Sequence, residues 1–403
     1  MLLAKLMRAI VSDGTVTLID AHGRAHDITK SGDPKVVLRV TDSKWHRRLL
    51  WQPRLSFGEA YVEGGLVFDE GTLKDFLYIF GTGQSDMDRT WHGELRRVVD
   101  SATHWLSHYN PVGRAQQNVA HHYDLSGGLY DLFLDSDKQY SCAYFRTGTE
   151  DIETAQTAKK EHIARKLCLE PGMRVLDVGS GWGGLGLYIA KEFGCDVTGV
   201  TLSKEQHRVS NDRAAEAGLA DRARYLLKDY RHVTERFDRV VSVGMLEHVG
   251  PPHYGEYFGR ISELLDTDGV ALIHTIGRMR KPRPINPWIR KYIFPGSYLP
   301  SASQLMKCVE NTSLWLTDFE NLRMHYAWTL DRWNDTFQKN RAKVANLYDE
   351  RFCRMWELYL QGCEMGFSIQ ELTVFQMQLA HKRAAAPLTR DYLYRAPMAL
   401  AAD

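Results

Sequence analysis

The chain has 403 residues, of which 44% are hydrophobic and 25% are charged, values close to the averages for folded globular proteins. Its 51 lysine and arginine residues nearly balance its 50 aspartate and glutamate residues, so a general attraction to nucleic acid is not supported and an anionic partner must meet a local basic patch. The length exceeds that of most single domains, so we expect one large domain and a smaller one.

The cysteines and the N-terminal segment exclude further classes of protein. No C-x-x-C pair occurs, which argues against a zinc ribbon or a disulfide framework, so we predict no metal site and a reducing, cytoplasmic location. The N-terminal run MLLAKLMRAIV is too short for a signal peptide or a membrane span, and an ordinary packed helix is the expectation there. The six cysteines are Cys142, Cys168, Cys195, Cys308, Cys353 and Cys363.

The first hundred residues predict a small α+β module. Residues 14–80 contain short strand-like runs separated by turn signals, and helical periodicity follows over residues 72–108. The Asn-Pro-Val-Gly break at residues 110–113 ends that helix. We therefore predict an N-terminal domain over residues 1–108, a linker over 109–120 and a second domain over 121–403.

The second domain begins as strands and helices in alternation, which predicts a parallel sheet covered by helices on both faces, a doubly wound α/β fold. After residue 275 comes a basic, proline-bearing insertion that extends to about residue 300, and the remaining third is expected to be mostly helical. The predicted strands are 174–178, 196–200, 223–227, 237–243 and 270–275, and the predicted helices are 185–193, 203–217 and 253–265.

A glycine-rich loop follows the first of these strands. Residues 179–184 satisfy G-x-G-x-x-G, a pattern that lets a backbone approach either a dinucleotide or an adenosyl cofactor. A dinucleotide site needs an acidic residue about twenty positions later, where this chain has Val200, Thr201 and Leu202, so NAD is disfavoured. Asp177, two residues before the loop, can hold the amino group of a methionine moiety, which favours S-adenosylmethionine (SAM).

Two segments carry a specific resemblance. Residues 175–184, followed by 199–206, resemble the cyclopropane-fatty-acid and mycolic-acid cyclopropane synthase family, which usually has cysteine where Ser180 stands. Further matches follow the family order at residues 140–145 (YSCAYF), 247–250 (EHVG), 274–277 (HTIG) and 325–330 (HYAWTL). The resemblance implies a Rossmann-like class I methyltransferase domain with helical additions, preceded here by the small α+β domain.

The resemblance also implies which residues contact SAM. The predicted cofactor-binding residues are Tyr140, Ser141, Asp177, Gly179, Gly181, Gly183, Thr201, Gln206, Asp229 and Tyr230. Two of these have an alternative interpretation. Gln206 stands three residues after Ser203 and can complete a capping box at a helix start, and Asp229 can be a solvent-exposed loop acid.

The reaction site is predicted at the carboxyl ends of two strands. Glu247 follows strand 237–243 and His274 ends strand 270–275, so both lie at the edge where α/β sheets bind ligands. In the family, SAM methylates an acyl double bond, and a bound bicarbonate removes a proton from the resulting cation so that a cyclopropane ring closes. By resemblance, bicarbonate is held by Glu247, His274 and Tyr326, with Cys142 and the backbone of Ile276 completing the cage.

The expected substrate is an unsaturated phospholipid in a membrane. Residues 57–65 resemble a segment in the N-terminal domain of the longer bacterial members, which is thought to engage lipid. Residues 278–291 contain six basic residues and no acid, so we expect peripheral contact with the inner face of the cytoplasmic membrane, although a solvated charged face would have the same composition. No nucleic-acid partner is expected, and a homodimer is left open.

Three other functions remain as alternatives. A related olefin methyltransferase would leave a methyl or methylene branch, because methyl transfer to the double bond is a shared first step. A small-molecule methyltransferase would modify soluble acceptors. A non-catalytic lipid-binding protein would have a degraded cofactor loop, which Gly179, Gly181 and Thr201 contradict.

Overall fold

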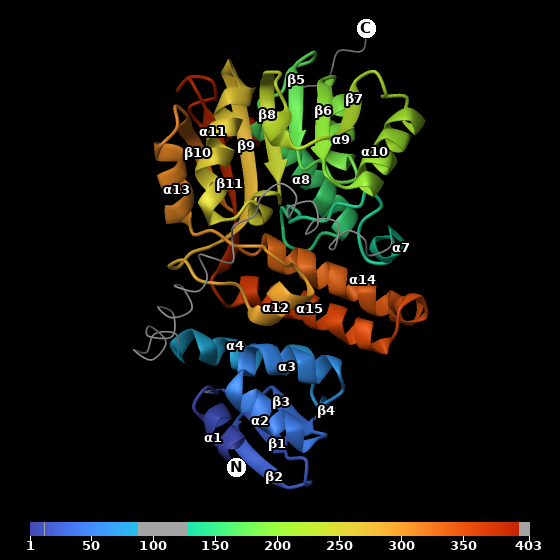
Figure 1. Cartoon of the computed structure of the whole chain (residues 1–403), viewed down its shortest axis with the longest axis vertical. Coiled ribbons are helices and arrows are strands. Elements are labelled where there is room, and N and C mark those ends of the chain that lie inside the picture. The colour runs from blue at the N-terminus through green and yellow to red at the C-terminus, as the bar shows by residue number, and fades with distance from the viewer. Residues whose placement is uncertain (12, 88–126, 395–403) are drawn as a thin grey trace. The chain divides into compact units, whose positions relative to one another are not determined.

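The structure is a computed structural model that describes residues 1–11, 13–87 and 127–394 (Figure 1). The chain divides into two compact units, neither of which is continuous in sequence. The first unit comprises Met1–Ser136, Gly277–Ser301 and Arg323–Thr373, and the second comprises Asp137–Ile276, Ala302–Leu322 and Val374–Asp403. The predicted linker, 109–120, lies outside the described residues, so the predicted domain boundary stays a prediction.

The first unit contains a four-stranded sheet in the order β2-β1-β3-β4. Strand β1 pairs with β2 antiparallel and with β3 parallel, and β4 closes the edge antiparallel to β3. Alternate residues such as Val16 and Leu18 are buried against α1 and α2, as a half-covered sheet requires. These elements are α1 (Leu2–Arg8), β1 (Gly14–Ile19), β2 (Ala25–Ser31), β3 (Lys35–Val40), α2 (Ser43–Trp51), α3 (Pro53–Val62) and β4 (Leu66–Glu70). The predicted small α+β domain is confirmed.

Helices from distant parts of the chain complete the first unit. They are α4 (Leu73–Met87), α7 (Gly127–Tyr130), α12 (Pro287–Tyr292), α14 (His325–Leu347) and α15 (Glu350–Ser368). Helix α15 packs against α14, α3 and α4. A Cβ at Gly81 of α4 would collide with the Met365 sulfur, so glycine lets α4 approach α15 closely without displacing that side chain. The Arg354 Nε of α15 donates to the Val62 carbonyl at the end of α3 at 3.0 Å.

The second unit is built on a seven-stranded sheet in the order β10-β11-β9-β8-β5-β6-β7. Strands β9, β8, β5, β6 and β7 are parallel, and the strand order reverses between β5 and β8, as in doubly wound sheets that bind ligands at that point. The strands are β5 (Arg174–Val178), β6 (Asp196–Thr201), β7 (Ala223–Leu227), β8 (Phe237–Val243), β9 (Leu265–Arg278), β10 (Trp315–Asn321) and β11 (Leu372–Ala380). The predicted doubly wound α/β class is confirmed.

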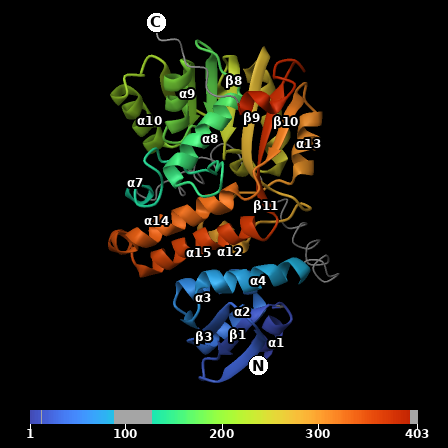
Figure 2. The same ribbon diagram turned by 180° about the vertical axis from the view of Figure 1, so that it is seen from behind.

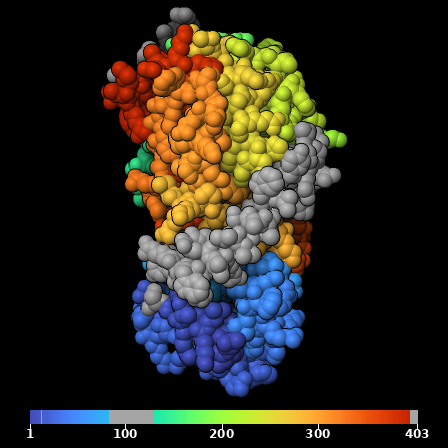
Figure 3. Space-filling view, turned by 60° about the vertical axis from the view of Figure 1, so that its left-hand side comes forward, coloured from blue at the N-terminus to red at the C-terminus, as the bar shows by residue number. Residues whose placement is uncertain are grey.

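Helices cover both faces of this sheet. Helices α8 (Ile152–Lys166), α9 (Gly184–Phe193) and α10 (Lys204–Glu216) contribute to one apolar cluster on the face seen in Figure 2. Helix α11 (Tyr254–Leu264) covers the opposite face, and α13 (Ala302–Glu310) packs beside it, as the yellow and orange surfaces of Figure 3 show. Short 3-10 turns occur at η1 (Tyr230–His232), η2 (Leu246–His248), η3 (Pro251–His253) and η4 (Arg390–Leu393).

Helices make up most of the regular structure of the C-terminal third, as expected, but two strands there were not predicted. They are the antiparallel pair β10 and β11, which extends the sheet beyond β9. Two buried glutamines, Gln376 and Gln378, interrupt the apolar run of β11, and β10 is a partly exposed edge strand with a polar sequence. Neither strand therefore has the apolar run that indicates a central strand. The predicted helix 72–108 is described as α4 up to Met87, and its remainder lies outside the described residues.

Candidate active site

The glycine loop after β5 combines a packed side with an open side. Gly179, Gly181 and Gly183 have φ values of 82°, 54° and 83°, a region that favours glycine. A Cβ at Gly183 would lie 2.8 Å from both Ser210 and Tyr225, so this glycine serves the packing of α9 and α10. A Cβ at Gly181 would meet nothing within 4 Å. The loop therefore leaves space beside Gly181 for a ligand.

Asp177 lies near the end of β5 and is 2% exposed. Its Oδ2 atom is buried and has no hydrogen-bond partner among the residues that the structure describes. Burial raises the pKa of this carboxyl to about 7, and the charge of Lys159 opposes the increase. A buried carboxylate oxygen without a partner is costly, so an ammonium group of a ligand would satisfy it.

Helix α8 holds the segment that carries Tyr140, Ser141 and Cys142. Gln156 Nε2 donates to the carbonyls of Gln139 at 3.1 Å and Ser141 at 3.0 Å. Lys159 is 1% exposed, and its Nζ donates to Gln139 Oε1 at 2.5 Å and to Ser141 Oγ at 2.9 Å. Sequence reasoning missed both α8 residues. The sequence does contain a signal for them. Two long polar side chains stand three residues apart on a helix face that also carries the buried residues Ala155 and Ile163.

The Gln206 side chain bonds to a residue at the end of β6 and not to the backbone of the helix cap. The Ser203 Oγ accepts from the Gln206 backbone N–H at 3.3 Å, which is one half of the capping box. The Gln206 side chain instead accepts from the Thr201 hydroxyl at 2.8 Å, and the Ser203 N–H donates to Thr201 Oγ1 at 3.2 Å. The reciprocal half of the box is therefore not formed, and both Thr201 and Gln206 are buried near the carboxyl edge.

The end of β7 places Asp229 and Tyr230 in a buried setting. Asp229 accepts from Arg231 Nε at 3.0 Å and from Arg231 Nη2 at 2.8 Å. Burial alone would raise the pKa of Asp229, but the hydrogen bonds from Arg231 outweigh burial and lower it. Tyr230 packs against Tyr257 of α11 with ring centroids 5.6 Å apart. Asp229 is thus 6% exposed and paired, which does not fit a solvent-exposed loop acid.

Glu247 and Ile276 are brought together at the ends of β8 and β9. The Ile276 backbone N–H donates to Glu247 Oε1 at 2.6 Å. Glu247 is 5% exposed, and its Oε2 is buried without a hydrogen-bond partner among the described residues. Burial raises the pKa of Glu247 to about 7, although the hydrogen bond from Ile276 acts in the opposite direction.

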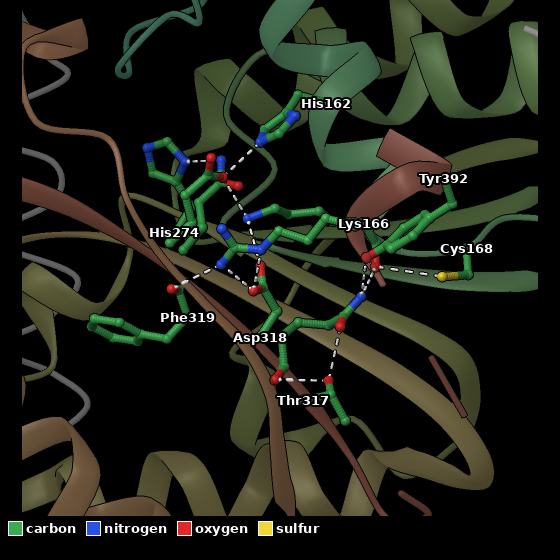
Figure 4. A network of polar contacts seen from close by, with 12 residues as sticks. His162, Lys166, Cys168, His274, Thr317, Asp318, Phe319 and Tyr392 are labelled. Carbon is green, nitrogen blue, oxygen red and sulfur yellow. Dashed lines mark hydrogen bonds and ion pairs between the residues drawn. The ribbon is translucent and has the colours of Figure 1, made fainter. Parts of the chain in front are cut away.

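His274 lies on β9 opposite Val243, the last residue of β8; β9 continues past it to Arg278, so the prediction that His274 ends its strand was wrong. The Gly244 N–H donates to the His274 carbonyl at 2.9 Å, which ties the end of β8 to β9. The imidazole is buried, and its Nδ1 lies 3.1 Å from Gln376 Nε2 of β11. Figure 4 shows the His274 ring beside the polar network that α8 forms with β10 and β11. Burial lowers the pKa of His274 to about 3, so the ring is neutral at physiological pH.

The other predicted catalytic residues occupy separate places. Cys142 is fully buried, with Sγ 3.3 Å from the Ala143 carbonyl. Tyr326 lies in the first turn of α14 in the first unit, where it packs against Trp333 and Phe367 with ring centroids 5.9 and 4.7 Å apart. Glu247 belongs to the second unit, so its meeting with Tyr326 stays a prediction.

Several basic side chains of segment 278–291 form ion pairs within the first unit. Glu371 accepts from Arg278 at 2.9 Å and pairs with Arg283 at 2.5 Å. Lys291 pairs with Glu59 of α3 at 2.8 Å. The segment therefore offers fewer free charges to a membrane than its sequence suggests. No helix in the described ranges is long and apolar enough to cross a membrane.

Comparisons with known proteins decide the family. Residues 112–377, more than half of the chain, match the family described as Mycolic acid cyclopropane synthetase. The chain belongs to this family. Membership in the mycolic acid cyclopropane synthetase family makes the protein a SAM-dependent methyltransferase.

Individual relatives match over different lengths. The cyclopropane-fatty-acyl-phospholipid synthase of Escherichia coli (strain K12) is 35% identical over 350 residues, which cover 87% of this chain and 89% of that protein. The tuberculostearic acid methyltransferase UfaA1 of Mycobacterium tuberculosis is 33% identical over 398 residues, with 93% and 90% covered. The structure of mycolic acid cyclopropane synthase CmaA1 complexed with SAH and CTAB has a TM-score of 0.62 at 35% identity, covering 66% of this chain and 97% of that one. A family member thus binds SAH, the demethylated form of the predicted cofactor.

Proposed function

We propose that this methyltransferase adds a methylene bridge to the cis double bond of an unsaturated phospholipid acyl chain. The proposal is supported by the E. coli relative, whose name states that product and which matches nearly the full length of both chains. The structural observations that support it are the buried, unpartnered Oε2 of Glu247, whose other oxygen contacts the Ile276 amide, and the buried, neutral ring of His274 two residues earlier on β9. Such a pair suits a small oxyanion and places no cation beside a reacting alkene.

The proposed SAM site uses groups that are buried and opposite in charge. Asp177 would hold the ammonium of the methionine moiety, because its Oδ2 lacks any other partner among the described residues. Ser141 would hold the carboxylate, and Lys159, which donates to Ser141 Oγ, would direct the hydroxyl proton toward that ligand. Thr201 and Gln206 would face the adenosyl end. When bound, SAM supplies the methyl group that becomes the bridge.

The remaining residues of the site would exclude water from the reacting acyl chain and hold the base that removes a proton from the cation. An alkene is a weak nucleophile, so the site must hold it in near-attack geometry and keep water from the cation that forms on the acyl chain. We propose that bicarbonate is the anion held beside Glu247 and His274, where it would serve as the base. Glu247 Oε2 can accept from its hydroxyl, and a neutral His274 can donate to it. The Ile276 N–H already serves Glu247, so any contact of that amide with the anion would be shared.

The experiment uses the full-length protein, SAM labelled in its methyl group and vesicles of cis-unsaturated phospholipid, with and without bicarbonate. We expect label in fatty acids that are one CH2 unit heavier, resist hydrogenation and give strained-ring proton signals. Removal of bicarbonate should decrease turnover. Label in a methyl- or methylene-branched chain would favour the branching alternative, and label in soluble acceptors alone would favour a small-molecule methyltransferase. A complete lack of label in lipid would refute the central proposal.

Peripheral membrane contact through residues 278–291 is a separate proposal. Lys281 and Arg290 are exposed, and no ion pair is described for either of them. Replacing both by alanine should weaken sedimentation with anionic vesicles, because each basic residue near such a surface contributes about 1 kcal/mol. Lys191→Ala, an exposed change on α9, is the control. Equal sedimentation of all three proteins would exclude this segment as the contact, and light scattering in the same buffer would test the homodimer.

A further inference from the structure

Gln376 is the only side chain described within hydrogen-bond distance of the His274 ring. It lies on β11, which neighbours β9 in the sheet, and its Nε2 is 3.1 Å from His274 Nδ1. Both side chains are buried, at 0% and 2% exposed. Sequence reasoning did not assign any role to Gln376, because a glutamine in the C-terminal third belongs to none of the family segments recognised there.

The surroundings of the second amide atom of Gln376, Oε1, indicate the direction of this hydrogen bond. With Nε2 toward His274, only Gln376 Oε1 is left buried without a partner among the described residues. Turning the amide over would place an NH2 group, with two donors, in that same unpartnered position. Buried donors without partners are rarer than under-satisfied carbonyl oxygens. Gln376 therefore donates, and Nδ1 of His274 accepts.

The charged groups around His274 keep the ring neutral. Lys159, Lys166 and His162 of α8 face it and disfavour a second proton, whereas Glu320 of β10 favours one. Glu320 is already paired with Lys166 at 2.6 Å and with His162 at 2.7 Å. A neutral imidazole has one proton on one of two nitrogens, and the hydrogen bond at one nitrogen decides which.

We propose that Gln376 is a positioning residue that holds His274 in its Nε2–H tautomer, so that the ring offers a donor to the anion. Nε2 has no described hydrogen-bond partner, which leaves its proton available to a bound oxyanion. In the opposite tautomer the lone pair of Nε2 would face the anion and repel it. The role of the anion rests on the proposed function, whereas the tautomer itself does not.

The test reads the tautomer directly by nitrogen NMR of protein labelled with 15N-histidine, with the His274 signals assigned by His274→Asn. In the wild type we expect a protonated Nε2 and an unprotonated Nδ1. Gln376→Glu replaces the donor by a carboxylate that can only accept, so Nδ1 should become protonated. Gln376→Met removes the donor and should populate both tautomers. A wild-type ring protonated at Nδ1 overturns the proposal, even if neither variant folds.

Gln378 provides a matched control on the same face of the same strand. Its Nε2 donates to the Lys166 carbonyl at 2.5 Å and to the Tyr392 hydroxyl at 3.0 Å, and no hydrogen bond between it and His274 is described. Gln378→Met should leave the His274 tautomer unchanged. Unaltered His274 signals in Gln376→Glu, or the same change in Gln378→Met, would overturn the proposal.

Kinetics separate positioning from a purely structural role. We expect Gln376→Glu to lower kcat by about 10- to 100-fold, as loss of an orienting partner does in comparable sites, while KM for SAM stays within about threefold. The bicarbonate concentration for half-maximal activity should rise. An unchanged kcat in a folded variant with a reversed tautomer would contradict the functional part of the inference. If the wild type labels no lipid but has the Nε2–H tautomer, the proposed function fails and the positioning of His274 by Gln376 stands.

Discussion

Glu247→Gln should make the folded protein more resistant to alkaline pH while it inactivates the enzyme. The substitution removes one ionisable group from a position that is 5% exposed, and its Oε1 can still accept from the Ile276 N–H. The new NH2 group occupies the place of the unpartnered Oε2. The glutamine side chain at position 247 is neutral at every pH. Comparison with the wild type therefore isolates the free-energy cost of ionising Glu247 in the folded state.

The size of that cost follows from the pKa. Burial raises the pKa of Glu247 from 4.5 to about 7, so the folded state binds this proton more tightly than the unfolded state. The cost is therefore absent below about pH 4.5, grows as the pH rises and is complete above about pH 7. Since one pKa unit corresponds to about 1.4 kcal/mol, ionisation costs about 3 kcal/mol at pH 8 and about 1 kcal/mol at pH 5.

The assay is unfolding of wild type and variant at pH 5 and pH 8 in buffer freed of bicarbonate and SAM. The difference in unfolding free energy should shift by about 2 kcal/mol in favour of Glu247→Gln between the two pH values. Glu216→Gln, an exposed change at the end of α10, should differ from the wild type equally at both. A constant difference for Glu247→Gln would refute the reasoning. Turnover should fall by about 100-fold or more, with SAH affinity within about threefold of the wild type.

Other substitutions test the remaining parts of the site. Asp177→Asn and Lys159→Met should each weaken SAH binding by about tenfold or more but leave 5′-methylthioadenosine, which lacks the amino-acid end, within about twofold by calorimetry; equal losses for both ligands would indicate a structural role. Gly183→Ala should lower the unfolding temperature by several degrees because its Cβ has no space, whereas Gly181→Ala should fold and lose SAH affinity; the reverse order would contradict the open-side assignment. Tyr326→Phe should reduce kcat by about 10-fold or more with little change in KM for SAM, and full activity would remove Tyr326 from the mechanism.

The sequence predicted the part of the fold that is apolar and local. The predicted strand 174–178 coincides with β5, and the predicted strand 196–200 differs from β6 by one residue. Buried parallel strands have short apolar runs between turn residues, so the pattern alone locates them. Strands β10 and β11 had no such pattern, because their stability comes from pairing and from side-chain partners on α8 that are distant in sequence.

The site was predictable where a residue follows directly from a strand end. Glu247 was located in this way, and the structure brings it together with the Ile276 amide, whereas His274 lies inside β9, which continues to Arg278. Lys159 and Gln376 could not be found by the same reasoning. Lys159 lies on a helix that precedes the first strand of the sheet, and Gln376 lies on the last strand along the chain. Only tertiary packing places Lys159 beside Ser141 and Gln376 beside His274.

The chain passes between its two compact units five times, after residues 136, 276, 301, 322 and 373. Loss of the N-terminal sheet therefore affects later segments of the same unit. Deleting it together with α3 and α4 would strip Glu357 of α15 of its hydrogen bond from Tyr61 and expose the thioether of Met365. Any descendant without the sheet would need compensating changes in α15, almost three hundred positions away from Tyr61. Substitutions in α3 are therefore expected to occur together with substitutions at the contacting positions of α15.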